Sequence, residues 1–302
     1  MSKNLLKASY GEIGKILTKK KIYRYAFNIG PTSSMSFLKR LGSGIGLIVI
    51  FGIMSYAIGI GMAEGFTSTS LTASYVNYIS LDTAKAIGFI GISIKPIELF
   101  VWGIYMLMSF LLIFPKKNFA RQLFFGTLTA VLFGTLLCSS ALPFCFGLTL
   151  GGFGPVGFIL QFLLACYFIF SAFRGSVVSL KRDLYGVSGA SSAKGISLKV
   201  LRRVLLSMVV VIMLNQYLFK IGHPLDASVY SLIYGWGVLV WSIAVVIVIK
   251  MVFRQTVSTY YFAKYDEQFR ESLHFSDEEW YGKRKARRLK KKANKRKRDS
   301  HE

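Results

Sequence analysis

Six apolar stretches, separated by polar and basic segments, dominate the pattern of this chain. A helix of about 20 mostly apolar residues can cross the ~30 Å hydrocarbon core of a bilayer, and helices satisfy their own backbone hydrogen bonds inside lipid. The pattern therefore predicts an all-α fold, a polytopic membrane helix bundle with six transmembrane helices. The apolar stretches are residues 44–62, 97–114, 122–146, 155–173, 204–222 and 230–253.

Positive charge is confined to alternate connecting segments. The chain has 38 Lys and Arg residues against 14 Asp and Glu, a net charge of +24. Thirty-four of the 38 lie in residues 1–43, 115–121 and 174–203 or after Phe253, and the four exceptions are Lys85, Lys95, Lys220 and Lys250. Because Lys and Arg are retained on the cytoplasmic side of a membrane, both termini are predicted to be cytoplasmic. A multi-pass protein of the plasma (inner) membrane is the expected location.

This organisation divides the chain into three regions. Residues 1–43 form a cytoplasmic basic amphipathic segment, residues 44–253 the six-span transmembrane domain, and residues 254–302 a cytoplasmic basic helical tail. The first apolar stretch could instead be a signal peptide cleaved near Met62–Ala63, although its basic leader is longer than such peptides carry. Cleavage would leave five spans in the same orientation.

The segment 4–27 has the pattern of a basic amphipathic helix. Its apolar residues recur at helical spacing and would share one face; they are Leu6, Tyr10, Ile13 and Leu17. The interleaved lysines suit anionic lipid headgroups, so a helix lying on the inner membrane surface is one interpretation. A juxtamembrane segment that only sets the topology is the other.

The tail has a well-defined helix start. Ser276 and Glu279 have the spacing of a capping box, and Phe275 and Trp280 that of a hydrophobic staple. The helix is predicted to continue into a run of twelve basic residues without an acidic one. These residues are Lys283, Arg284, Lys285, Arg287, Arg288, Lys290, Lys291, Lys292, Lys295, Arg296, Lys297 and Arg298.

Such a run predicts a polyanionic partner. Anionic lipid headgroups would attract each cation near the surface, RNA or a ribosome would bind through its phosphates, and an acidic protein is the third candidate. No aromatic residue interrupts the basic run, so stacking on bases is not indicated.

The predicted spans carry little reactive chemistry. Glu98 is expected at the outer end of the second span in an ion pair with Lys95, and no span centre is expected to hold an ionisable group. Since intramembrane ionisable residues mark proton and ion paths, this counts against a proton-coupled carrier. Catalytic and metal-binding motifs are absent, so no enzyme activity, cofactor or metal is predicted; Cys138 and Cys145 are expected to pack as apolar side chains.

Four polar residues fall at a similar predicted depth, about 10 Å below the outer surface at 1.5 Å per residue. They are Ser55, Ser139, Gln161 and Asn215. A shared layer could line an outward-facing vestibule for a polar solute or a passing chain. Ordinary hydrogen bonding between helices is the simpler interpretation.

Glycines mark two further features. Gly42, Gly44, Gly46, Gly52, Gly59 and Gly61, in or beside the first span, are expected to form a close-packing face. The glycine-rich link 147–157 predicts a tight turn between the third and fourth spans, with a re-entrant bend as the alternative. The segment 63–96 is expected to be the sizeable outer segment, and Pro96 to mark entry into the second span. Its apolar part around Ile87–Ile94 could lie in the membrane interface or dip into the membrane.

Spans with few reactive residues, together with large basic segments, favour a non-enzymatic membrane subunit of a larger transport, secretion or conjugation-type complex. Six spans, cytoplasmic ends and a helix before the first span are similar to ABC-2-type exporter permeases, in architecture only; this alternative implies an ATPase that docks on residues 174–203. A ribosome- or RNA-associated membrane-protein biogenesis factor is the other alternative. The expected partners are anionic lipids, other membrane proteins and, through the tail, RNA or a ribosome.

Overall fold

The computed structural model describes residues 4–26, 37–67, 79–114, 117–186, 198–219 and 234–299. Every regular element within these ranges is helical. Parts of the predicted connecting segments, residues 68–78 and 187–197, lie outside the described residues, as do residues 220–233 at the ends of the fifth and sixth predicted spans.

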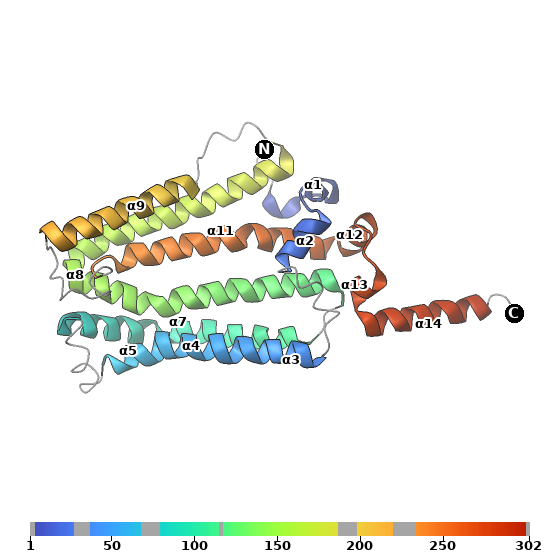
Figure 1. Cartoon of the computed structure of the whole chain (residues 1–302), viewed down its shortest axis with the longest axis horizontal. Helices are drawn as coiled ribbons and strands as arrows, with labels where there is room; N and C mark the ends of the chain where they lie inside the picture. Colours follow the sequence, from blue (N-terminus) through green and yellow to red (C-terminus); the bar gives the residue numbers. More distant parts are fainter. Residues whose placement is uncertain are drawn as a thin grey trace.

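Long helices run side by side through the molecule (Figure 1). The first run comprises α3 (Phe37–Gly46), η3 (Leu47–Ile53), α4 (Met54–Tyr56), η4 (Ala57–Gly61) and α5 (Met62–Gly65). It packs beside α7 (Leu81–Ile113), and α7 packs on α8 (Phe119–Tyr185). Helix α11 (Gly237–Lys264) has its most extensive contacts with α8, and α9 (Leu198–Leu214), which continues as η5 (Asn215–Phe219), lies at the edge (Figure 1).

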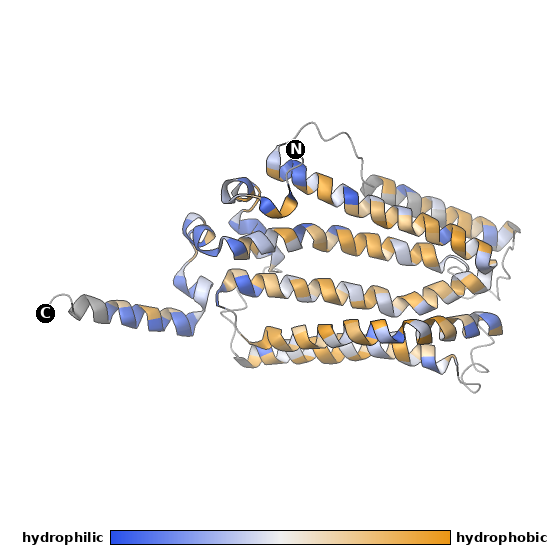
Figure 2. Ribbon diagram, turned by 180° about the vertical axis from the view of Figure 1, so that it is seen from behind, coloured by the Kyte–Doolittle hydropathy of each residue, from blue (hydrophilic) through white to orange (hydrophobic). Residues whose placement is uncertain are grey.

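Among the described residues, four helices are long and apolar enough to cross a membrane: Arg40–Gly65, Leu81–Ile113, Phe119–Tyr185 and Gly237–Lys264. Figure 2 shows the parallel part of the structure coloured as mainly hydrophobic, and the short helices and α14 as hydrophilic. Large apolar side chains such as Phe100, Phe170 and Met251 are 64–70% exposed. A surface of this kind suits lipid rather than water, and it supports a membrane protein.

Helix α8 doubles back on itself. Gly154 is its one described residue with a non-helical backbone (φ 66°, ψ −172°), and the chain reverses direction there (Figure 1). Only glycine adopts such a conformation at little cost. The predicted turn in 147–157 is therefore confirmed, although it is a kink at one residue, and Gly147, Gly151 and Gly152 are helical.

Helix α7 begins much earlier than the apolar pattern predicts. Ser80 caps it by accepting a hydrogen bond from the Thr83 backbone N–H, and Pro96 lies inside the helix. Residues 81–96, predicted as part of an outer segment, are thus helical, and the helix of the second predicted span begins well before Pro96. Two close contacts hold this added helix: Gly147 and Gly151 leave room for Ile87 and Thr83, which an added Cβ would meet at 2.3 and 1.6 Å.

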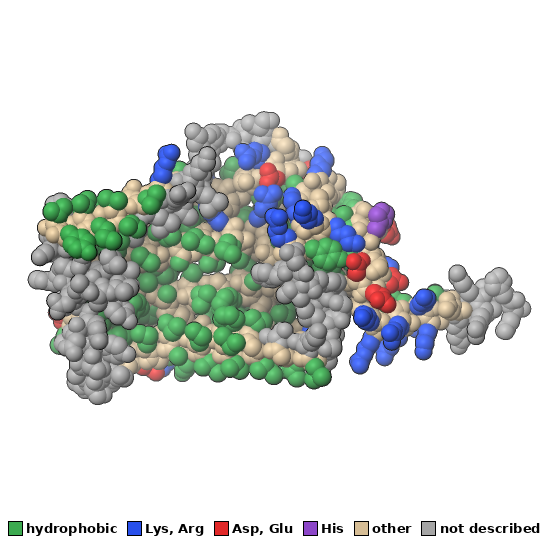
Figure 3. Space-filling view, viewed as in Figure 1, with side chains coloured by type: hydrophobic (Ala, Val, Ile, Leu, Met, Phe, Trp, Pro, Cys, Tyr) green, Lys and Arg blue, Asp and Glu red, His purple; other side chains and the backbone are tan. Residues whose placement is uncertain are grey.

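At the opposite end of the bundle, the N-terminal segment and residues 257–281 meet in a cluster of buried aromatic and aliphatic side chains. Helices α1 (Tyr10–Gly14) and α2 (Lys19–Tyr25) pack on the end of α11 and on α12 (Asp266–Ser272) and α13 (Asp277–Tyr281). This end of the molecule, with basic side chains around α1, α2 and α14, is here called the basic end (Figure 3). Ile13, Leu17 and Ile22 are at most 2% exposed. The prediction of one continuous helix over 4–27 is therefore wrong, and most of its apolar face is covered by protein.

The tail begins as predicted and then breaks. The Ser276–Glu279 capping box is formed, and the Phe275 and Trp280 rings lie 5.3 Å apart, as a hydrophobic staple requires. However, α13 ends at Tyr281, because Gly282 has a backbone φ of 81°. The basic run then forms a separate helix, α14 (Lys283–Asp299), which projects away from the bundle (Figure 1).

Candidate functional site

A glutamate lies buried near the middle of α7, between this helix and its neighbours. Glu98 is 2% exposed. The expected ion pair with Lys95 is wrong, because Lys95 pairs with Glu64 at the end of α5 and both of those side chains are exposed. The expectation that no span centre carries an ionisable group is also wrong, because the early start of α7 places Glu98 well inside the helix.

Gly59 provides the space that the Glu98 carboxyl occupies. A Cβ atom at residue 59 would lie 1.7 Å from Glu98 Oε1 and 2.5 Å from its Cδ. Real atoms cannot approach so closely, so any other residue at this position would displace the carboxyl. The first span and α7 therefore fit together around this acid.

Gly59 belongs to a row of glycines that faces α7. Added Cβ atoms at Gly44 and Gly52 would meet Ile113 at 2.5 Å and Met106 at 2.8 Å. The predicted close-packing face is thus confirmed for Gly44, Gly52 and Gly59. It does not include Gly42 and Gly46, which have no atom within 4 Å of an added Cβ, and Gly61 meets only its own helix.

The backbone beside the carboxyl is also unusual. Gly59 lies within η4, and Ser55 lies one turn earlier, between the two π-helical segments of the first span. Wide π-helical turns are rare and are often found at functional sites. Here they place a glycine, rather than a larger side chain, opposite Glu98.

The carboxyl has few polar neighbours. Both of its oxygens are buried and have no hydrogen-bond partner among the described residues. The Ser140 hydroxyl of α8 lies near Glu98, but no hydrogen bond is formed between them. Within the described part of the chain, the Ser140 hydroxyl is itself buried without a partner. Ser55 is 2% exposed, and its hydroxyl also has no partner among these residues.

This arrangement restricts the chemical state of the site. An ionised carboxylate is very costly to bury without a partner. The closed site therefore holds either a protonated Glu98 or a cation bound between the carboxylate and hydroxyl oxygens. Within the described residues, no cluster of three or more His, Cys, Asp or Glu could hold a metal ion.

The four polar residues predicted to form a layer differ in their contacts. Ser139 donates to the carbonyl of Leu136 in its own helix, 2.9 Å away, whereas the neighbouring Ser140 faces the carboxyl. Gln161 donates to the carbonyl of Gly235 at 2.6 Å. Asn215 begins η5. The described contacts of Ser139 and Gln161 do not join either residue to Ser55.

The basic end forms a second candidate site, for a polyanion. Lys and Arg side chains gather over α1, α2 and α14 (Figure 3). In the same view, the long parallel helices present a mainly apolar face. In α14 the basic side chains from Lys283 to Lys292 are exposed, and Ala286 is the buried residue among them. The side chains of Lys295–Arg298 lie outside the described ones.

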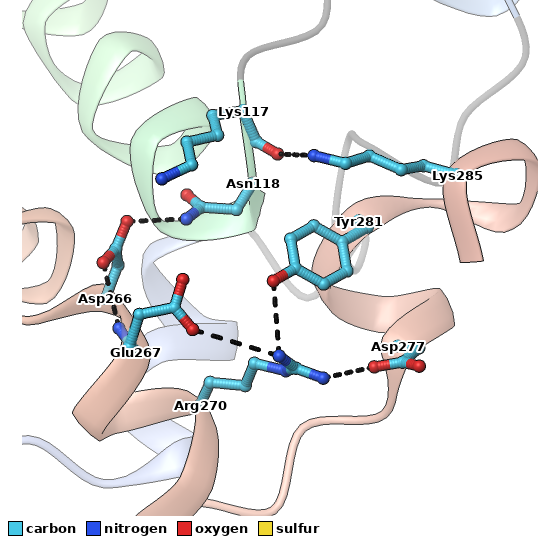
Figure 4. A network of polar contacts seen from close by, with 8 residues as sticks. All are labelled: Lys117, Asn118, Asp266, Glu267, Arg270, Asp277, Tyr281 and Lys285. Carbon is cyan, nitrogen blue, oxygen red and sulfur yellow. Dashed lines mark hydrogen bonds and ion pairs between the residues drawn. The ribbon is translucent and has the colours of Figure 1, made fainter. Parts of the chain in front are cut away.

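Polar contacts attach this helix to the bundle (Figure 4). Lys285 donates to the carbonyl of Lys117 at 3.1 Å, just before α8. Arg270 of α12 pairs with Asp277 and donates to the Tyr281 hydroxyl at 3.2 Å. Asp266 accepts a 2.7 Å hydrogen bond from Asn118, which caps α8. The start of α14 is therefore held in place, while its basic side chains up to Lys292 stay exposed.

One contact ties the N-terminal segment to the tail. The Tyr23 hydroxyl donates to Glu279 at 2.6 Å, and Lys19 lies 3.5 Å from the same carboxylate. Burial, together with the adjacent Glu279, raises the pKa of Tyr23 to about 12. Burial alone would raise the pKa of Glu279, but the hydrogen bonds from Tyr23 and Ser276 and the Lys19 charge outweigh it and lower that pKa.

No protein-family model, curated protein or solved structure matches the chain. Sequence reasoning missed Glu98 because it placed the acid beside Lys95 at a helix end. The available signal was the apolar run on both sides of residues 95–98, which continues through Pro96.

Proposed function

We propose that this protein is a non-enzymatic membrane subunit of a transport or secretion complex, and that protonation or cation binding at Glu98 takes part in its cycle. The observation that carries the proposal is the buried Glu98 carboxyl, which has no hydrogen-bond partner among the residues that the structure describes. Ionisable groups inside membrane helices are costly and rare, and they commonly belong to ion paths and proton relays. The expected lack of ionisable groups in the spans counted against a proton-coupled carrier, and the buried Glu98 supports proton coupling instead.

The proposed topology has six spans with both termini in the cytoplasm of a plasma (inner) membrane. Three observations support it. The kink at Gly154 divides α8 into two antiparallel parts, each long enough to cross. Helix α9 and η5 together are 22 residues long, sufficient for about 30 Å of hydrocarbon. The basic segments lie at one end, as positive charge in the cytoplasm requires.

A lipophilic carbodiimide tests the proton-binding part of this function. A protonated carboxyl transfers its proton to a carbodiimide nitrogen while its oxygen bonds to the central carbon, and rearrangement leaves a stable N-acylurea that adds the whole reagent to the residue. Purified protein in mild detergent is treated over a range of pH, and the adducts are located by mass spectrometry. We expect Glu98 to be modified, and the modification to decrease as the pH rises.

Matched controls separate this site from ordinary carboxyls. Glu64 is exposed and paired with Lys95, so it should show little modification by the lipophilic reagent. Glu98→Gln should remove the adduct on α7 and leave modification elsewhere unchanged. Lack of modification at Glu98 at every pH, in protein that remains folded, would contradict a protonatable intramembrane site.

The projecting α14 favours a second function, docking on a ribosome or another polyanion during membrane-protein biogenesis. Affinity-purified full-length protein and a 283–302 deletion are compared by mass spectrometry and by an RNA assay. Ribosomal components that disappear with the tail support biogenesis. Membrane proteins or an ATPase that remain without the tail support the transport or secretion complex, or an ABC-2-like exporter.

A further inference from the structure

A cavity of about 570 Å³ lies between the first span, α7 and the first half of α8, on the side of the basic end. It extends along α8 from Phe119 to Phe133, which at 1.5 Å per residue is about 21 Å. The Phe51 and Phe133 rings, 4.6 Å apart, both line the cavity at the part farthest from the basic end. Its volume is typical of a ligand site.

The cavity is elongated and mostly apolar, and glycines widen it. An added Cβ at Gly46 or Gly126 would have no atom within 4 Å, so the space beside these two residues is open. The polar side chains of the wall are directed elsewhere: Gln255 donates to the Tyr25 carbonyl at 3.3 Å, and Thr127 donates to the Leu123 carbonyl at 2.9 Å. The interior therefore suits a hydrocarbon chain.

The end of the cavity nearest the basic end differs from this apolar interior, because it carries an arginine. The Nε of Arg40 is buried and has no hydrogen-bond partner within the described part of the chain. A second cation, Arg284 of α14, lies near enough to repel the Arg40 charge. A buried guanidinium N–H without an acceptor is costly, and a phosphate would satisfy both arginines.

We propose that this cavity binds one acyl chain of an anionic glycerophospholipid, whose phosphate lies against Arg40 and Arg284. The apolar cavity fits the acyl chain of that lipid, and the two arginines fit its phosphate. One leaflet of the hydrocarbon core is about 15 Å thick, half of the whole core, so a chain that enters beside Arg40 ends before Phe133. The site is separate from Glu98 and does not depend on the function proposed for that residue.

Native mass spectrometry of the full-length protein tests the proposal with two lipids of identical acyl chains, phosphatidylglycerol and phosphatidylcholine. We expect phosphatidylglycerol to bind about tenfold more tightly, and Arg40→Gln to abolish this preference. Gly126→Leu, which fills the open space, should reduce binding of phosphatidylglycerol about tenfold. Gly46→Leu fills the opposite wall and provides a second test should one variant fail to fold, as judged by thermal unfolding.

Gly103→Leu is the matched control, because Gly103 also has no atom within 4 Å of an added Cβ but is exposed and does not line the cavity. This variant should bind as the unmodified protein does. Equal affinity for the two lipids would overturn the role of the arginines. Unchanged binding in both folded cavity-filling variants would overturn the acyl-chain site, and displacement of the lipid by millimolar inorganic phosphate would assign the arginines to free phosphate instead.

Discussion

Trp280 is the residue whose removal should most clearly detach the tail from the bundle. Its side chain is 0% exposed. Its ring lies 5.3 Å from Phe275, 5.6 Å from Phe262 on α11 and 6.5 Å from Phe119 on α8, measured between centroids. It therefore joins α13 to two long helices. Replacing a buried Trp by Ala costs about 3–5 kcal/mol, and this loss should fall on the docking of α13.

The Trp280 indole also provides its own control. Its Nε1 is buried without a hydrogen-bond partner among the described residues, and such a donor costs about 1–3 kcal/mol. Phenylalanine retains an aromatic ring and removes the unpaired N–H, while it leaves a small void. These effects oppose one another, so Trp280→Phe should change the docking free energy by less than about 1.5 kcal/mol, the usual limit for volume-conserving changes.

Native-state proteolysis in mild detergent measures this docking. When opening is fast relative to cleavage, the rate of cleavage follows the population of the open form. A loss of 3–5 kcal/mol corresponds to an increase of about two to more than three orders of magnitude, at 1.4 kcal/mol per factor of ten. Trp280→Ala should therefore be cleaved far faster between α12 and α14, with cleavage in the long helices unchanged. Equal rates for Trp280→Ala and unmodified protein would refute the packing argument, as would equally fast cleavage of Trp280→Phe.

Three smaller perturbations test neighbouring parts of the structure. Gly59→Ala should destabilise the bundle by about 1–3 kcal/mol, the usual cost of overpacking, because its Cβ would lie 1.7 Å from a carboxyl oxygen; Gly42→Ala, with open space, should lower the thermal midpoint in detergent far less. The raised pKa of Tyr23 predicts that docking of α2 is complete below pH 10 and is lost as the pH rises toward about 12, whereas the lowered pKa of Glu279 predicts a second loss as the pH falls below its ordinary value. Proteolysis of the N-terminal segment measures both, and Tyr23→Phe should remove the alkaline loss. Deleting residues 283–302 should leave insertion and topology unchanged, as cysteine accessibility would show; an inverted chain would mean that the tail determines the topology.

Local sequence patterns predicted the start of the tail correctly. The capping box and hydrophobic staple require only residues 275–280, and both are present. The predicted continuation of this helix into the basic run is wrong because Gly282 ends it, and glycine readily takes the positive-φ conformation that ends a helix. A charge pattern does not indicate such a break, because basic residues follow Gly282 in either case.

The N-terminal segment shows a different limit. Amphipathic periodicity predicts an apolar face, but it does not say whether lipid or protein covers that face. In the structure Ile13 and Ile22 pack with Tyr261 and Phe269, which are about 240 or more positions away in the sequence. The density of aromatic residues in 260–281 was the signal that a protein partner for this face existed.

Glu98 could not have been located from spacing alone, because its environment is made by three separate segments. Its depth depends on where α7 begins, its space on Gly59, and its polar neighbour on Ser140 of α8. A window over the apolar residues around 98 contains none of this information. Long-range packing decides whether a lone acid in such a window lies at a surface or in an interior.

The buried carboxyl and the lipid cavity share one interface, that of the first span and α7 with α8. Glu98 and Leu112, which lines the cavity, are 14 residues apart on α7, about 21 Å along one helix. Neither site can be rearranged by a rotation of α7 against α8 without the other responding, since a straight helix moves as one body. Charging Glu98 inside this interface would favour opening it to water, while a bound acyl chain would favour the packing around the cavity. Glu98 and Leu112 both follow Pro96, the residue at which a hydrogen bond of the helix is missing, so the two sites are linked through a stretch of α7 that this break does not interrupt.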